Sequence, residues 1–293
     1  MTANRPIIAF LGFGEAGGAF AGGLAETEVA TLRAYDLKLE GPEADVKRAE
    51  LSGAGAAQMA DAVALGPGAA AIFSLVTADQ AGVAAEAAAP GCAGGVLYFD
   101  CNSCAPQLKR ANAALIEAAG GRHVDVAVMS AVHPRRHRSP LLVSGPHRDA
   151  ALDLLQRLGM VASDAGEEVG DASGIKLARS IMVKGFEALM CESLMAARAM
   201  GVEDRVLASL DDSHPGFDWR GLATTLAGMP QHGVRRAWEM EAAAQMVDAL
   251  GLPGGLAAET ALWERRVGEA GLVPGENAAQ TGDALLAALA PKT

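Results

Sequence analysis

Short apolar runs alternate with Ala-rich segments of helical period through the first half of the chain. The runs lie at about residues 6–11, 30–35, 70–76, 95–99, 124–129 and 140–144. Runs of this length predict buried strands, and the segments between them, such as residues 79–89 and 105–119, predict helices. Strands that alternate with helices form parallel sheets, so the pattern predicts an α/β Rossmann fold with a mostly parallel, doubly wound sheet.

The second half of the chain is patterned for helices alone. A long helical pattern runs from about Gly166 to Met200, where Gly201 can end it. A chain of 293 residues with 51% apolar content can bury two cores. We therefore predict a dinucleotide-binding Rossmann domain over residues 1–166. A long helix joins it to an all-helical substrate and dimerisation domain over residues 167–293.

Composition narrows the class of protein. The net charge of −11 argues against nucleic-acid binding, which needs a basic surface, so any anion site is local. The apolar segments are interrupted before they reach membrane-spanning length, and the N-terminus lacks the order of a signal peptide. Four cysteines are too few for a disulfide scaffold in a chain of this size. We predict a soluble cytoplasmic protein that binds neither nucleic acid nor membrane.

A glycine-rich motif follows the first predicted strand and opens a helix. It consists of Gly12, Phe13, Gly14, Glu15, Ala16 and Gly17. Gly12 would permit the tight turn, Gly14 would let a pyrophosphate approach the backbone, and Gly17 would let the helix pack closely on the strand. A glycine turn without a ligand is the alternative, but the strand and helix around the motif favour a dinucleotide site.

Asp36 ends the second predicted strand, where an acidic residue accepts hydrogen bonds from the adenosine ribose. Because a carboxylate there repels a 2′-phosphate, NAD is the expected cofactor, although Lys38 leaves NADP open. Residues at the end of a third strand are expected to line the nicotinamide end of the site, namely Ser74, Val76 and Thr77.

Two loops are candidates for holding a substrate. In the segment 100–106, Asn102 and Ser103 can donate hydrogen bonds to a carboxylate, or alternatively cap the helix that begins at Pro106. Its two cysteines lack a second Cys/His pair at metal-binding spacing, so we predict no metal site. The loop 133–138, His-Pro-Arg-Arg-His-Arg, is a local anion site for a carboxylate or phosphate, or else a basic turn that pairs with surface acids.

Lys176, Ser180 and Lys184 stand four residues apart and therefore on one side of the long predicted helix. In a cleft, this polar stripe would suit proton exchange with a hydroxyl, whereas on a solvated face it would be an ordinary basic stripe. Farther on, Arg235 and Arg236 are expected to pair with Glu239 or Glu241 on a helix surface, or alternatively to reach the cleft. The Ala-rich and Met-rich face of this domain predicts a homodimer.

Together these motifs resemble the β-hydroxyacid dehydrogenase family, the relatives of 6-phosphogluconate dehydrogenase and 3-hydroxyisobutyrate dehydrogenase. The matching segments are the glycine motif 12–17, the loop 100–106 and the segment Gly170-Asp-Ala-Ser-Gly-Ile-Lys176. The resemblance implies that Lys176 is the general acid/base and that Asn102 and Ser103 contact a substrate carboxylate. Here Asn102 and Ser180 replace the family's Ser and Asn, and the family's Ser-Gly-Gly loop appears as Met129-Ser130-Ala131. These departures resemble a less characterised subgroup whose features include Lys184 and the segments 128–134 and 229–240.

We therefore expect an NAD(P)-dependent oxidoreductase that transfers hydride between nicotinamide and the hydroxyl-bearing carbon of a small acidic metabolite. Lys176 is the expected general acid/base, and Ser180 orients the substrate or the lysine. The acidic group is expected to be held by Asn102, Ser103, Ser130, His133, Arg135 and Lys184. The alternatives are an imine reductase or oxidative decarboxylase of the same fold, and a catalytically silent NAD-binding protein.

Overall fold

The structure is a computed structural model that describes residues 5–219, 221, 228–273 and 278–289. The chain divides into two compact units, Met1–Lys176 and Leu177–Thr293. The division falls within a long helix, α6 (Asp171–Ala199), whereas the predicted boundary between residues 166 and 167 precedes it.

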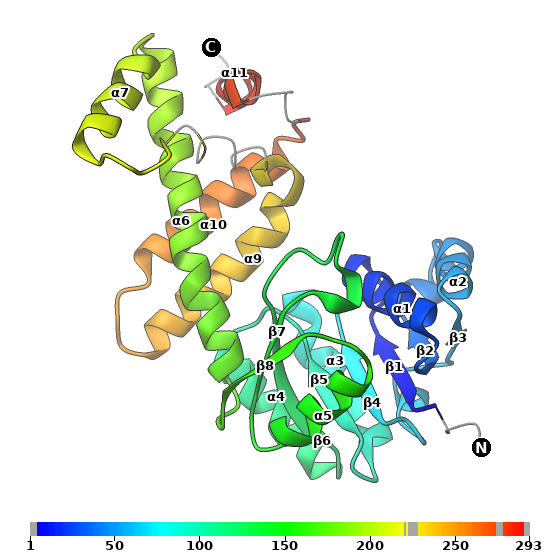
Figure 1. Ribbon diagram of the computed structural model, residues 1–293. Helices are drawn as coiled ribbons and strands as arrows, with labels where there is room; N and C mark the ends of the chain where they lie inside the picture. The colour runs from blue at the N-terminus through cyan, green and yellow to red at the C-terminus, as the bar shows by residue number, and fades with distance from the viewer. Residues whose placement is uncertain (1–4, 220, 222–227, 274–277, 290–293) are drawn as a thin grey trace. The chain divides into compact units, whose positions relative to one another are not determined.

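The first unit is an eight-stranded sheet with helices on both of its faces (Figure 1). The strands are β1 (Ile7–Leu11), β2 (Thr31–Tyr35), β3 (Ala56–Gln58), β4 (Ala71–Ser74), β5 (Leu97–Asp100), β6 (Arg122–Val128), β7 (Leu141–Ser144) and β8 (Ala162–Gly166). The helices are α1 (Glu15–Thr27), α2 (Ala44–Gly53), α3 (Ala81–Ala88), α4 (Pro106–Ala118) and α5 (Arg148–Arg157), with short 3-10 turns between elements. The spatial order of the strands is β3-β2-β1-β4-β5-β6-β7-β8, and it reverses direction between β1 and β4. Ligands of such sheets bind beyond the carboxyl ends of the strands at this switch point.

The predicted mostly parallel sheet is confirmed, with one antiparallel pair and two strands that the sequence did not indicate. β6 and β7 pair antiparallel because only a loop joins them, without a crossover helix. β3 has three residues, two of them exposed, and β8 has the sequence Ala-Ser-Asp-Ala-Gly with no buried position. Neither carries the apolar run by which a buried strand is recognised.

Three stacked phenylalanines fix the strands on either side of the switch point. Phe10, Phe73 and Phe99 occupy matching positions on β1, β4 and β5, with ring centroids 5.7 Å and 4.6 Å apart. Phe20 from α1 meets the Phe73 ring edge-on at 6.3 Å. All four rings are fully buried, so the strand ends and α1 are held in one packed layer.

The second unit is helical. Beyond α6 it contains α7 (Glu203–Ser213), α9 (Gly228–Ala249), α10 (Gly255–Glu269) and α11 (Ala278–Leu289). Its apolar core includes Met190, Leu194, Met229, Val267 and Leu285. α9 and α10 touch through two glycines: a Cβ on Gly233 would lie 2.2 Å from the carbonyl oxygen of Glu264, and one on Gly268 would lie 2.6 Å from the nitrogen of Val234. In the described part of the chain, no helix is both long and apolar enough to span a membrane.

The second unit also contains a buried ion cluster, where one sequence prediction is wrong. Arg236 on α9 pairs with Glu187 on α6 and lies 3.5 Å from a carboxylate oxygen of Glu264 on α10, instead of pairing along its own helix. Glu241 pairs with Arg265. The prediction failed because Arg236 faces neighbouring helices, while only Arg235 is exposed on the surface.

Glu264 makes the stability of this unit depend on pH. Its side chain is fully buried, neither carboxylate oxygen has a hydrogen-bond partner among the described residues, and burial raises its pKa to about 7 despite Arg236 nearby. A carboxyl group whose pKa is higher in the folded than in the unfolded chain stabilises the fold through its protonated form. This stabilisation is complete below the pKa of the unfolded chain and is lost as the pH rises through the pKa of the folded chain. We expect the wild type to lose ~3 kcal/mol relative to Glu264→Gln between pH about 4.5 and about 7, measured by urea unfolding. Parallel pH profiles for the two proteins would contradict this assignment.

Candidate functional site

The glycine loop lies at the switch point, directly after β1. Gly12 has a φ of +88°, and a Cβ there would lie 2.6 Å from the carbonyl oxygen of Leu75. A Cβ on Gly17 would lie 2.4 Å from the carbonyl oxygen of Gly12, whereas one on Gly14 would meet no atom within 4 Å. Gly12 and Gly17 are therefore required by the turn and by close packing. Gly14 instead leaves open space beside the start of α1, which no side chain caps.

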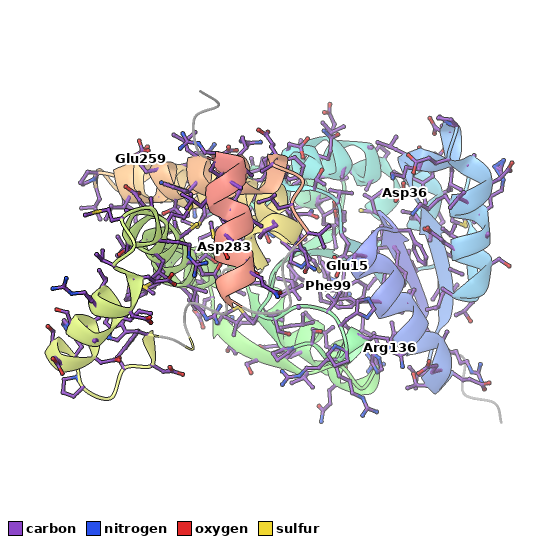
Figure 2. All side chains as sticks on the ribbon, turned by 90° about the horizontal axis from the view of Figure 1, so that it is seen from above. Glu15, Asp36, Phe99, Arg136, Glu259 and Asp283 are labelled. Atoms are coloured by element: carbon purple, nitrogen blue, oxygen red, sulfur yellow. The ribbon has the colours of Figure 1, made fainter. Side chains whose placement is uncertain are left out.

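Two side chains fix this loop through hydrogen bonds to the backbone N–H and carbonyl of Phe13. The Phe13 N–H donates to Asp36 Oδ2 at 2.7 Å, and Lys47 Nζ donates to the Phe13 carbonyl at 2.7 Å. Asp36 Oδ1 also accepts from the backbone N–H of Lys38. Each carboxylate oxygen of Asp36 thus has a backbone donor and keeps a lone pair for a ribose hydroxyl. Figure 2 shows Glu15 and Asp36 in the N-terminal part of the chain, coloured blue.

Sequence reasoning missed Lys47 and named Lys38 as the residue that leaves NADP open. Lys47 is buried on α2, although its sequence neighbourhood is that of a polar surface helix. The side chain of Lys38 pairs with Glu43 on the exposed surface at 2.9 Å. In this structure Lys38 thus pairs with a surface carboxylate beside Asp36.

The loops after β4 and β5 are joined by Asn102. Its Oδ1 accepts from the Val76 N–H at 2.8 Å, and its Nδ2 donates to Ser74 Oγ at 3.0 Å and to Asp100 Oδ1 at 2.8 Å. Asn102 and Ser74 are buried, while Thr77 is exposed. Both amide hydrogens of Asn102 are used inside the protein, so this side chain positions the loops and does not donate to a substrate as expected. α4 begins at Pro106 as predicted, without a side-chain cap from this loop.

Ser103 and Lys176, which are 73 residues apart in the sequence, meet at this edge of the sheet. Lys176 Nζ donates to Ser103 Oγ at 2.6 Å. The loop after β5 and the first turns of α6 are therefore brought together, and the lysine and hydroxyl form a pair able to hold and move a proton.

The start of α6 is fixed by Asp125, a buried residue of β6. Its Oδ2 accepts from the backbone N–H groups of Gly170 and Ser173 and from the hydroxyls of Ser173 and Ser144, at 3.0–3.1 Å. Ser144 Oγ in turn accepts from the Ala172 N–H at 3.0 Å. A carboxylate at a helix N-terminus satisfies unpaired N–H groups and complements the helix dipole, so the position of Lys176 is set by the sheet.

Lys109 links the two segments from within the core. Its Nζ donates to the carbonyl and Oδ1 of Asp100 at 2.5 and 3.0 Å, and lies 3.3 Å from Asp125 Oδ1, a contact with ion-pair distance but not hydrogen-bond geometry. All three side chains are fully buried. Burial alone would lower the pKa of Lys109 and raise that of Asp100. Their mutual attraction, with His123 adding to it at Asp100, overcomes this, so the pKa of Lys109 lies well above its ordinary value and that of Asp100 well below.

The basic loop is docked on α1 by two of its residues. Both terminal nitrogens of Arg136 pair with Glu26, at 2.6 and 2.5 Å. His137 is buried against α1, where a Cβ on Gly23 would lie 2.1 Å from its Nδ1, and its pKa is lowered by burial and by the neighbouring arginines. Arg136 therefore pairs with a surface acid, which was the alternative to an anion site in this loop. The polar residues of the loop region that are exposed are Ser130, His133, Arg135 and Arg138.

The other two residues of the predicted stripe belong to the second unit. Ser180 Oγ donates to Glu239 Oε1 at 2.6 Å, and Lys184 Nζ lies 2.9 Å from the same oxygen and 3.3 Å from Ser180 Oγ. The predicted side-by-side placement of Ser180 and Lys184 is confirmed. Glu239, their common partner, was expected to pair with an arginine instead.

A family model, a curated protein and a solved structure that match this chain are all of unknown function. Residues 197–267 match a domain of unknown function, DUF1932. An uncharacterised 28.5 kDa protein of Methanothermus fervidus is 26% identical over 117 residues, which span 40% of this chain and 44% of that protein. A conserved hypothetical protein from Sinorhizobium meliloti 1021 is 33% identical, with 98% of each chain covered and a TM-score of 0.80.

Three other solved structures share the fold, and two of them carry a named activity. A conserved protein of unknown function, reported as structurally similar to 3-hydroxyacid dehydrogenases, is 27% identical, covers 94% of this chain and 99% of its own, and has a TM-score of 0.72. A 3-hydroxyisobutyrate dehydrogenase from Mycobacterium tuberculosis, solved with L-serine, is 16% identical over 98% and 100% of the two chains, with a TM-score of 0.75. A reductive aminase from Aspergillus terreus, solved with NADPH, is 18% identical over 94% and 98%, with a TM-score of 0.58.

Two glycine variants distinguish a position that close packing requires to be glycine from one that faces open space. Gly17→Ala places a methyl group against the Gly12 carbonyl and should lower the free energy of unfolding by ~2 kcal/mol. Gly14→Ala meets open space at an allowed φ of −82° and should change it by less than ~1 kcal/mol. Urea unfolding of both variants tests this, and equal losses would show that the loop packing is not as described.

Proposed function

The chain belongs to the 3-hydroxyacid dehydrogenase-like family, in an uncharacterised subgroup, and from this premise we propose that it is a nicotinamide-dependent dehydrogenase of a small hydroxy acid. The observation that carries the proposal is the contact between Lys176 and Ser103. This contact joins an ammonium group and a hydroxyl at the carboxyl-end edge of a Rossmann sheet, which supports a role in proton transfer.

The glycine loop supports a dinucleotide at the switch point. Gly14 leaves room for a pyrophosphate, the uncapped start of α1 offers N–H groups and the positive end of a helix dipole, and Asp36 keeps acceptor capacity for ribose hydroxyls. These residues fit a nicotinamide nucleotide, whose ring would exchange hydride with the substrate carbon. Asp36 favours NAD over NADP, because its charge opposes a 2′-phosphate.

Lys176 is the proposed general acid/base. In the oxidative direction its Nζ accepts the proton of the substrate hydroxyl, and in the reductive direction it returns that proton. Ser103 holds Nζ in place, and the Asp125 cap fixes the helix that carries the lysine. The acidic group of the substrate would be held by Ser103 and by the exposed side chains of the basic loop, chiefly His133 and Arg135, with Ser130 beside them.

Replacement of the lysine tests this proposal. Oxidation of a panel of small hydroxy acids is followed by the absorbance of the reduced nicotinamide, with NAD and NADP in parallel. Lys176→Ala should lower turnover by at least ~100-fold and leave nucleotide affinity unchanged, because the side chain acts on the substrate proton. Arg179→Ala, an exposed neighbour on the same helix, is the matched control and should retain full turnover.

The outcomes distinguish the proposal from its rivals. Loss of nucleotide affinity in Lys176→Ala would argue that the lysine belongs to the cofactor site. Nucleotide binding without turnover of any panel member would favour a silent nucleotide-binding protein. Analysis of the products separates simple dehydrogenation from imine reduction and from oxidative decarboxylation.

A further inference from the structure

Asp100 and Asp125 place two carboxylates side by side in the core of the sheet. They are register partners on the parallel strands β5 and β6, and both side chains are fully buried. Two like charges this close repel each other strongly where water is excluded. The ammonium group of Lys109, on α4, lies 3.0 Å from Asp100 Oδ1 and 3.3 Å from Asp125 Oδ1, so it attracts both carboxylates and offsets their repulsion.

Lys109 fixes the end of β5 as well as the side chain of Asp100. Its Nζ donates to the backbone carbonyl of Asp100 at 2.5 Å and to Oδ1 at 3.0 Å. Burial opposes the charges of both groups, but their mutual attraction outweighs it, which raises the pKa of Lys109 and lowers that of Asp100. The lysine therefore stays protonated, with its hydrogens directed to the strand end.

The Asp100 carboxylate holds the loop that carries Ser103. Its Oδ1 accepts from the backbone N–H of Asn102 at 3.2 Å and from the Asn102 amide at 2.8 Å. Its Oδ2 accepts from the amide of Asn112 at 2.9 Å, on the same helix as Lys109. α4 thus holds Asp100 through two side chains, and Asp100 holds the residue directly before Ser103.

The Asp125 carboxylate holds the helix that carries Lys176. Its Oδ2 accepts from the backbone N–H groups of Gly170 and Ser173 at 3.1 and 3.0 Å, and Ser173 stands one turn before the lysine. Its Oδ1 has no hydrogen-bond partner among the described residues and faces Lys109 Nζ at 3.3 Å. The two oxygens of Asp125 therefore divide between the helix and Lys109, so the ammonium group influences where the cap lies.

We propose that Lys109 is a positioning residue for proton transfer, which sets the separation of Lys176 and Ser103 through the two carboxylates that it joins. The inference rests on the proposed function, in which this pair moves the substrate proton. Because its side chain is fully buried, Lys109 acts through the loop and the helix cap and not on the substrate. Its loss should slow the chemical step and leave nucleotide binding unchanged, since the glycine loop is held separately by Lys47.

The variant Lys109→Met keeps the apolar stem of the side chain and removes its charge. With the hydroxy acid that the wild type oxidises fastest, its kcat should be at least about tenfold lower, because a displaced acid/base fits the transition state poorly. The dissociation constant of the nucleotide should not change. Lys47→Met is the matched control, because it removes a second buried lysine of the same unit and should instead weaken nucleotide binding.

Amide hydrogen exchange reports this positioning without any activity. In Lys109→Met the amides of Asn102 and Ser173, which the two carboxylates bind, should exchange at least about tenfold faster relative to the amide of Phe73. Phe73 lies in the sheet core and reports global opening. In Lys47→Met both exchange ratios should match those of the wild type.

The double variant Lys109→Met/Asp100→Asn serves if the single variant does not fold. It removes one positive and one negative charge, so the net charge of the core stays the same, and the new amide oxygen can still accept from Asn102. Its kcat should fall as in the single variant, and Ser173 should exchange faster, because the link to Asp125 is lost.

The outcomes separate positioning from a purely structural role. Wild-type kcat in either folded variant, or an unchanged exchange ratio at Ser173, would overturn the inference, even if the variant is less stable. A wild type that turns over no hydroxy acid would count against the proposed function instead, and the exchange ratios would still show whether Lys109 fixes the two segments.

Discussion

A single buried ammonium group holds the candidate site together. Lys109 lies between Asp100 and Asp125, all three without solvent exposure, and removal of one partner from such a group leaves an uncompensated buried charge at a cost of about 3–5 kcal/mol. Asp100 belongs to the strand that leads into the Asn102 and Ser103 loop, and Asp125 caps the helix that carries Lys176. The contact between Ser103 and Lys176 therefore depends on Lys109, which touches neither residue in any described contact.

Buried groups also fix the glycine loop that follows β1. Asp36 and Lys47 hold the two polar atoms of the Phe13 residue, and the stacked phenylalanines hold the strand ends from which the loops start. The loops at the switch point are thus fixed from inside by buried polar groups, while their open sides are formed by glycine and small residues. Such an arrangement suits a site that must be in position before its ligand arrives.

The parts of the site that the sequence predicted are those encoded by local patterns. The glycine motif, Asp36, and the strand and helix around them follow from spacing alone, and the order of motifs led to Lys176 and Ser103. Lys109 and Lys47 were missed because each stands in a helix where a lysine ordinarily faces water, and only tertiary contacts show that these two are buried. Asn102 and Lys184 were identified as polar residues near the site. Asn102 donates both amide hydrogens to protein partners and Lys184 pairs with Glu239, which no one-dimensional pattern reveals.

We propose that the carboxyl-end edge of this sheet binds a nicotinamide nucleotide within reach of Lys176. Isothermal titration of the wild-type chain with NAD and NADP, side by side, tests it most directly. We expect saturable binding of one nucleotide per chain, tighter for NAD because of the charge on Asp36. Absence of binding by both nucleotides would contradict it.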